Sequence, residues 1–414
     1  MKKFFAIALA LTMLLALAAC GDSSSSTPAA STPAASTPAD DGGASADDTG
    51  NAATGDPVKV GFLGFMSGPD NYLGVQPELA IKDYLEEVNA NGGWLGRPVE
   101  LVTYDVARSI DEFVPATTKM IEQDGCVAIV GPTNSAGALA AMPVVTENEI
   151  PLVAMSATSE KVTINETTGE LNPYMFRVCF IDPYLAEGLS NFALDSLGLK
   201  KIAVLGDVTN AYSVGLTDIF VEAFEGRGGE VVAQEGFNEN DIEFRAQLAN
   251  IGATDAEAIF LPANNIRYGV LAAQQARELG IEIPFIMPDS VYGPELLEAA
   301  EELEGSYVGT GLIDDDPAYD DYRAQFTAKH NLNANIFVYY GLDAIMAVEA
   351  AVKQANSLEP NDIRNALETL TDAPVFTGSL TVDPATHNPL NKPVTIMEIK
   401  DGEFALKEVF DPSK

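Results

Sequence analysis

Three small hydroxyl side chains follow two strands that the sequence predicts as neighbours. The predicted strands cover residues 127–130 and 150–155 with a helix between them; Ser135 follows the first, and Ser156 and Thr158 follow the second. Because a helical crossover requires parallel strands, both end at one edge of their sheet. Hydroxyls and free helix N-terminal amides converge there and suit a small anion such as a carboxylate. No activating base is near, which indicates binding and not catalysis; helix capping and strand-end solvation are the alternative explanations.

A carboxylate and two aromatic rings are candidates for the opposite wall of such a site. Asp289 follows the predicted strand 284–287 and could pair with a ligand ammonium, although a solvated or capping Asp would fit the same position. Tyr72 and Tyr212 lie in loops after predicted strands, either as cavity walls or as ordinary half-buried aromatics. Ligands prefer clefts between domains, which is where these loops lie if the chain forms two lobes.

Strands and helices alternate along most of the chain. Two runs of this alternation, residues 58–155 and 201–301, predict an α/β fold of two doubly wound lobes with parallel sheets. The remaining strands, predicted at 376–382, 394–399 and 404–409, are expected to complete the two sheets already begun. The chain is therefore expected to cross between the lobes more than once.

The first 57 residues predict export and attachment. Residues 1–20 combine two lysines, an apolar run too short to span a bilayer comfortably, and the ending Leu-Ala-Ala-Cys-Gly. This ending resembles the bacterial lipobox, in which Cys20 is lipidated and anchors the chain to a membrane; an ordinary signal peptide with a chance cysteine is the alternative. Residues 21–57 are rich in Ser, Thr, Pro and Ala and predict a disordered tether.

Composition excludes one class of partner. The chain has 61 acidic and 23 basic residues, and its formal net charge is −38 at pH 7. Nucleic-acid binding requires a basic face, so we expect none. With Cys20 lipidated, Cys126 and Cys179 remain; each lies in an apolar stretch, which favours two buried thiols over a disulfide.

The sequence lacks the motifs of enzymes, metal sites and cofactor sites. It contains no HExxH, CxxC, GxSxG, GxGxxG or GxxxxGK[ST] pattern. The two histidines, His330 and His387, fall in a predicted helix end and a polar turn, so both are expected at the surface. We therefore expect no enzyme activity, no cofactor and no metal.

Several segments resemble the branched-chain amino acid binding lipoproteins of ABC transporters, in the type I periplasmic-binding-protein superfamily. They are VGFLGFMSGP (60–69), NANGGWLGRPVELVTYD (89–105), GPTNSAGALAAMPVV (131–145), Ser156-Ala157-Thr158 and NPYMFRV (172–178). The similarity extends from about residue 58 to the C-terminus. It implies two Rossmann-like lobes, joined by a three-crossover hinge, that close on a ligand.

The resemblance also implies roles for individual residues. Ser135 and Thr158, with the backbone of Ser156 beside Ala157, would bind the α-carboxylate of an amino acid. Tyr212 would be the second-lobe aromatic of the site.

The acidic residue that takes the α-ammonium in the family falls on Asp289. Two features depart from the family pattern. No cysteine occupies positions 107 and 134, where some members carry a disulfide, and Leu73 separates Tyr72 from the glycine that usually follows that aromatic.

Sequence pattern and resemblance together give expected domain boundaries. These are a lipoprotein signal peptide (1–20), a tether (21–57), a first lobe in two parts (58–181 and 313–392) and a second lobe in two parts (182–312 and 393–414).

The function implied is that of a monomeric, extracytoplasmic, lipid-anchored solute-binding protein. It would bind a branched-chain or other apolar amino acid by hinge closure and deliver it to ABC permease and ATPase subunits. Two alternatives stay open: the same fold with urea, an amide or an aromatic acid as ligand, or a sensory receptor subunit.

Overall fold

The structure is a computed structural model that describes residues 52–107, 109–390 and 392–410. The predicted signal peptide, Cys20 and most of the predicted tether lie outside these residues. Within the described part of the chain, no helix has the length and apolar composition needed to cross a membrane.

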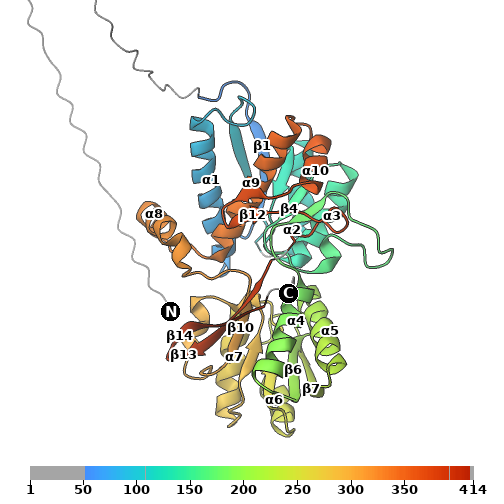
Figure 1. The fold of residues 1–414 in the computed structure, drawn as a ribbon, viewed down its shortest axis with the longest axis vertical. Helices are drawn as coiled ribbons and strands as arrows, with labels where there is room; N and C mark the ends of the chain where they lie inside the picture. Colours follow the sequence, from blue (N-terminus) through green and yellow to red (C-terminus); the bar gives the residue numbers. More distant parts are fainter. Residues whose placement is uncertain (1–51, 108, 391, 411–414) are drawn as a thin grey trace, which may run out of the picture. The chain divides into compact units, whose positions relative to one another are not determined.

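Five parallel strands form the first sheet, in the order β2-β1-β3-β4-β5 (Figure 1). Its internal strand β1, between β2 and β3, is buried almost throughout, as expected for a parallel sheet with helices on both faces. The predicted parallel α/β lobe is confirmed here. The strands are β1 (Val58–Gly64), β2 (Val99–Asp105), β3 (Ala128–Val130), β4 (Leu152–Ala154) and β5 (Met175–Arg177).

Helices cover both faces of this sheet. On one face α1 (Val75–Ala90) and α9 (Ile336–Ala355) lie side by side (Figure 1), and their apolar residues share a core with Val60 and Phe62 of β1. On the other face α2 (Ile110–Glu122) and α3 (Ser135–Glu147) pack against β1 and β4. A further helix, α10 (Pro360–Glu368), packs on α9.

Seven strands form the second sheet, in the order β14-β13-β10-β9-β8-β6-β7. Those from β6 to β10 are parallel, while β13 and β14 form the predicted hairpin and are antiparallel to their neighbours. The strands are β6 (Lys201–Asp207), β7 (Glu230–Phe237), β8 (Ala258–Phe260), β9 (Phe285–Met287), β10 (Tyr307–Thr310), β13 (Val394–Lys400) and β14 (Glu403–Phe410).

Alternate residues of β6 enter two different cores, because helices also cover both faces of the second sheet. Ile202 and Val204 face α4 (Asp182–Asn191) and α5 (Ala211–Gly226), whereas Ala203 and Leu205 share a core with α6 (Arg245–Gly252) and α7 (Ile266–Glu278).

The chain passes between the two sheets three times. It leaves the first sheet after β5, returns after β10 to form α8 (Asp320–His330), α9 and α10, and enters the second sheet again at β13. One expectation is wrong: the strand predicted at 376–382 joins neither main sheet. In its place β11 (Ala373–Val375) and β12 (Gly378–Leu380) pair only with each other, because the turn between them folds the chain back on itself.

Short helical turns complete the connections. One is π-helical, η3 (Phe192–Ser196), and the rest are 3₁₀: η1 (Asn71–Leu73), η2 (Glu160–Val162), η4 (Asp289–Val291), η5 (Pro294–Ala299) and η6 (Pro317–Tyr319).

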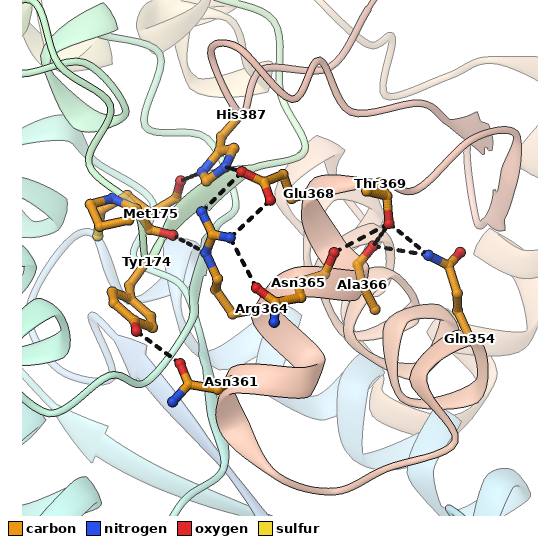
Figure 2. A network of polar contacts seen from close by, with 11 residues as sticks. Tyr174, Met175, Gln354, Asn361, Arg364, Asn365, Ala366, Glu368, Thr369 and His387 are labelled. Carbon is orange, nitrogen blue, oxygen red and sulfur yellow. Dashed lines mark hydrogen bonds and ion pairs between the residues drawn. The ribbon is translucent and has the colours of Figure 1, made fainter.

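His387 is buried, so its expected surface position is wrong. Its ring stacks on Phe176 of β5 with centroids 4.0 Å apart. Its Nδ1 lies 2.9 Å from the carbonyl oxygen of Met175 (Figure 2). Its Nε2 lies 3.3 Å from Glu368, which also pairs with Arg364. Burial lowers the pKa of His387. The polar turn is thus fixed to β5, a contact that the turn's own sequence does not show.

Both described cysteines are free thiols, as predicted. Cys126 and Cys179 are buried and unpaired, and burial raises the pKa of each to about 12. Neither is therefore a reactive thiolate at neutral pH.

Candidate ligand-binding site

A cavity of about 250 Å³ lies between strand ends of the two sheets. Six of the residues predicted for the site line it: Tyr72, Ser135, Ser156, Thr158, Tyr212 and Asp289. The seventh, Ala157, is fully buried behind them. The other lining residues are Phe65, Leu73, Ile110, Thr133, Asn134, Ala136, Thr209, Asn210, Ala211, Glu239, Asn264, Asn265, Ser290 and Phe337. The carboxyl-end loops of both sheets therefore meet at one cavity, as the predicted topology requires.

Ser135 presents a hydroxyl at the N-terminus of a helix. It is the first residue of α3, whose N-cap Asn134 accepts a hydrogen bond of 2.8 Å from the N–H of Gly137. The Ser135 Oγ accepts a bond of 3.2 Å from the N–H of Ser159, which leaves its own proton available to donate. This hydroxyl and the positive end of the helix dipole suit an anion.

Arg177 fixes the loop that follows β4, a role that the sequence analysis did not predict. Its guanidinium is 1% exposed and donates to the carbonyl oxygens of Ala157 (2.6 Å) and Ser159 (2.8 Å). The Ser156 hydroxyl donates to the Thr133 carbonyl oxygen at 2.8 Å and so ties this loop to the one after β3. An arginine inside an apolar strand was the available signal, since a buried charge needs buried partners.

Tyr212 and Asp289 form a buried pair on the second lobe. Tyr212 lies in the first turn of α5, whose N-cap Asn210 accepts a bond of 3.0 Å from the Tyr212 N–H. The Tyr212 hydroxyl donates to Asp289 Oδ1 at 2.7 Å, and each residue is 8% exposed. Asp289 begins η4 directly after β9 and Pro288. One oxygen of its carboxylate is thus oriented by the phenol.

Asp182 is a second buried carboxylate beside this pair, and it was not among the predicted residues. It begins α4, is 1% exposed, and its N–H donates to the Thr158 carbonyl oxygen at 3.0 Å. The Thr158 hydroxyl also bonds to its carboxylate, while the other oxygen, Oδ1, is buried without a partner. Its Asp-Pro context predicted only a helix start; its position after β5, at the same edge as Thr158, was the available signal.

Comparison with known sequences assigns the family. The sequence profile described as "Periplasmic binding protein" matches residues 57–403. The chain belongs to the periplasmic binding protein family. This family consists of non-catalytic binding proteins.

Two curated relatives of this periplasmic binding protein have distant sequences. The Leu/Ile/Val-binding protein BraC3 of Rhizobium johnstonii is 25% identical over 326 residues, covering 78% of this chain and 87% of the relative. An amino acid binding protein of Pseudomonas aeruginosa is 27% identical over 328 residues, covering 77% of this chain and 84% of the relative.

Solved structures agree on the fold. The leucine binding protein LivK of Thermotoga maritima has a TM-score of 0.78 and 28% identity, covering 86% of this chain and 99% of its own. LivJ of Streptococcus pneumoniae, in complex with isoleucine, has a TM-score of 0.77 and 26% identity, covering 86% and 100%. A solute binding protein of R. palustris in complex with benzoate, at 20% identity and a TM-score of 0.74, shows the fold alone. The predicted type I periplasmic-binding-protein fold is therefore confirmed.

The site of this periplasmic binding protein holds excess negative charge. Burial raises the pKa of Asp289 to about 6, although the Tyr212 hydrogen bond opposes the shift. Burial also raises the pKa of Asp182 to about 7, and the charge of Asp289 adds to this, while Thr158 and the charge of Arg177 oppose it. None of the described lining residues is Lys or Arg. A bound cation would supply the missing positive charge.

A polar contact crosses the cleft, and two aromatic rings form part of its wall. Asn265, the N-cap of α7, donates from Nδ2 to Oδ1 of Asp70 in the first lobe at 3.2 Å. The rings of Tyr72 and Phe337 lie edge to face with centroids 6.1 Å apart. Among residues 52–107, 109–390 and 392–410, no three His, Cys, Asp or Glu side chains are grouped to hold a metal ion.

Proposed function

We propose that this chain is the solute-binding protein of an ABC importer and that its ligand is an α-amino acid. Membership of the family supports solute binding. The relatives named as leucine-, Leu/Ile/Val-, branched-chain amino acid- or amino acid-binding proteins support this ligand class. In this proposal Cys20, outside the described residues, carries a lipid anchor on the extracytoplasmic side, and permease and ATPase subunits are the partners.

The observation that carries the proposal is a cavity whose two sides favour ligand groups of opposite charge. Ser135 and the α3 N-terminus favour an anion, whereas the buried pair Tyr212–Asp289 favours a cation. An α-amino acid is a small molecule with one charge of each sign on adjacent groups. Its carboxylate would lie against Ser135 and Thr158 and its ammonium against Asp289. Only the closed arrangement satisfies both charges, so ligand binding would favour hinge closure.

The test is a thermal-shift panel on the purified full-length protein after denaturation and refolding to remove bound ligand. The panel contains the twenty amino acids, urea, acetamide and benzoate. A ligand at ~100 times its Kd adds about 2.7 kcal/mol to the free energy of unfolding, which is readily resolved. We expect stabilisation by a subset of L-amino acids.

The Asp289→Ala variant tests the ammonium partner, and Asp218→Ala, an exposed position on α5, is its matched control. Removing one partner of a buried charge pair weakens binding by about 2–5 kcal/mol, so Asp289→Ala is expected to abolish the shift in the assay range. Asp218→Ala is expected to retain it. A response to benzoate or urea alone, unchanged by Asp289→Ala, would rule out an amino acid ligand.

An aromatic acid is the second candidate, since a structural neighbour holds benzoate. The buried carboxylates of Asp182 and Asp289 disfavour it, because an acid without an ammonium would bring a further negative charge to them and no cation. A sensory receptor subunit is a further alternative. Genes for two permeases and two ATPases beside this one would favour transport.

A further inference from the structure

The part of the cavity wall without a role in binding the two charges carries both apolar and polar side chains. Leu73, Ile110 and the rings of Phe65, Tyr72 and Phe337 give the first lobe an apolar strip. Ala136 and Ala211 also line this part of the wall. The other side chains in it carry a hydroxyl, an amide or a carboxyl group: Thr133, Asn134, Thr209, Asn210, Glu239, Asn264, Asn265 and Ser290. The second lobe thus contributes no branched aliphatic side chain to the described wall.

Two of these amides have unused hydrogen-bonding capacity. The Asn264 side chain has no hydrogen bond to any described residue, and its Oδ1 is buried. Asn134 uses Oδ1 to cap α3, which leaves its NH₂ group without a partner in the described chain. Asn265 differs, because its Oδ1 accepts from the Arg267 N–H and its Nδ2 donates to Asp70.

A closed cleft excludes water from these groups, so the ligand decides whether they are paired. Leucine, isoleucine or valine would offer Asn264 and Asn134 only hydrocarbon, and each would keep a desolvated, unpaired amide group. An amide or hydroxyl on the ligand can donate to one and accept from the other. Sites built from such groups discriminate strongly against analogues that lack the matching polar atom.

We propose that the ligand is an α-amino acid whose uncharged side chain carries an amide or a hydroxyl. This inference rests on the proposed function, and it departs from the expectation of a branched-chain or other apolar ligand. The apolar strip would hold the methylene stem of the ligand, and Asn264 and Asn134 would pair with its polar end. The cavity, about 250 Å³, is below the range of ~300–1,000 Å³ typical of drug-sized ligands, which suits a single amino acid.

Charge in the wall argues against an acidic side chain. Glu239 lines the cavity, the buried carboxylates of Asp182 and Asp289 lie beside it, and none of the described lining residues is basic. A second carboxylate on the ligand would meet this repulsion and no basic side chain among the described lining residues. Glutamine, asparagine, serine and threonine therefore fit the wall better than glutamate or aspartate.

The experiment is isothermal titration calorimetry on ligand-free full-length protein with glutamine, asparagine, serine, threonine, leucine, isoleucine, valine, lysine and glutamate. We expect at least one of the first four to bind about tenfold or more tightly than leucine, isoleucine and valine. The reason is that an apolar ligand leaves at least one amide group of the cavity wall without a hydrogen-bond partner. Tighter binding of a branched-chain, cationic or acidic amino acid would overturn this inference and leave the amino acid function standing. Binding of no amino acid at all would overturn both.

Two variants test the residues themselves. Asn264→Leu is expected to weaken the preferred polar ligand about tenfold and to narrow its advantage over leucine, whereas Asn250→Leu, an exposed position on α6, should change neither. Asn134→Asp keeps the oxygen that caps α3 and replaces only the unused NH₂ group, so it should fold normally and weaken the same ligand. An unchanged preference in both Asn264→Leu and Asn134→Asp would overturn the assignment.

Discussion

At the scale of single residues, the site is defined by two carboxylates that burial keeps partly protonated near neutral pH. Asp289 and Asp182 are 8% and 1% exposed, and both pKa values are raised in the free protein. Thr158, Arg177, Cys179 and Tyr212 are the titratable or polar groups around them. An incoming ammonium stabilises the ionised carboxylates, so the pKa values fall in the complex. Ligand binding should therefore release protons.

This linkage predicts that affinity falls as the solution is acidified from about pH 8 to about pH 5, by up to ~tenfold per pH unit for each proton released. The loss should begin near pH 7 and become steepest below pH 6, where Asp182 and Asp289 are both protonated in the free protein and must release their protons to bind the ammonium. Calorimetry in two buffers of different ionisation enthalpy measures the released protons directly. Asp182→Asn should make the dependence shallower. Affinity that rises in acid would contradict the assignment of these carboxylates to the ammonium.

Residues at strand ends were predictable, and residues whose role depends on long-range contacts were not. Ser135, Thr158 and Asp289 each follow a strand that the sequence pattern predicts, and parallel topology brings them to the carboxyl edges of the two sheets, which meet at the cavity. Asp182 was missed because an Asp-Pro pair at a helix start has a sufficient local explanation. Arg177 was missed because its partners are backbone carbonyl oxygens, and every residue has one, so no residue type indicates the contact.

At the scale of elements, the first crossover is held to the first-lobe loop of the site. Arg177 ends β5 and donates to the carbonyls of Ala157 and Ser159, and the Asp182 N–H at the start of α4 donates to the Thr158 carbonyl. The loop after β4 therefore depends on the segment that leads into the second lobe. Occupation of that loop by a carboxylate would act directly on the hinge.

Arg177→Met should destabilise the protein by about 1–3 kcal/mol, because it leaves the buried Ala157 carbonyl oxygen without a donor and the Ser159 carbonyl oxygen with the Val162 N–H alone. Urea denaturation measures the loss, and ligand affinity should fall as well because the loop is released. Arg245→Met is the matched control: Arg245 is 42% exposed and pairs with Glu243 and Glu278, and such surface pairs contribute about 0–1 kcal/mol. Equal stability loss in the two variants would show that the loop does not depend on Arg177.

The predicted elements were most accurate where periodicity is local. The β-α alternation of both lobes and the β13–β14 hairpin follow from short-range patterns. The β11–β12 pair and the burial of His387 do not, because each is decided by contacts with a distant segment or by a tight turn. A polar turn that packs onto β5 is indistinguishable in sequence from one that faces water.

At the scale of the whole described chain, the two lobes already touch across the cleft through Asn265 and Asp70. The hydrogen bond from the Asn265 amide to the Asp70 carboxylate would add only a small net free energy to the closed state without ligand. Ligand contacts on both sides would shift the equilibrium toward closure in proportion to their preference for that state.

Paired cysteines at positions 70 and 265 report this shift. In the Asp70→Cys, Asn265→Cys double variant, ligand should accelerate disulfide formation, because closure brings the two positions together. The buried thiols of Cys126 and Cys179 should not compete. Each single variant is a control, and loss of the α7 cap in Asn265→Cys costs about 1 kcal/mol. If the disulfide formed at the same rate with and without ligand, hinge closure on ligand binding would be contradicted.

The three crossovers also bear on how the chain is made. One face of the first sheet is covered by α1 and α9, and α9 is synthesised long after β5. At ribosomal rates α9 emerges on the order of ten seconds or more after the strands that it covers. Until then Val60 and Phe62 have no finished core to enter. If residues 1–20 act as the predicted signal peptide, this delay would help to keep the chain unfolded while it is exported.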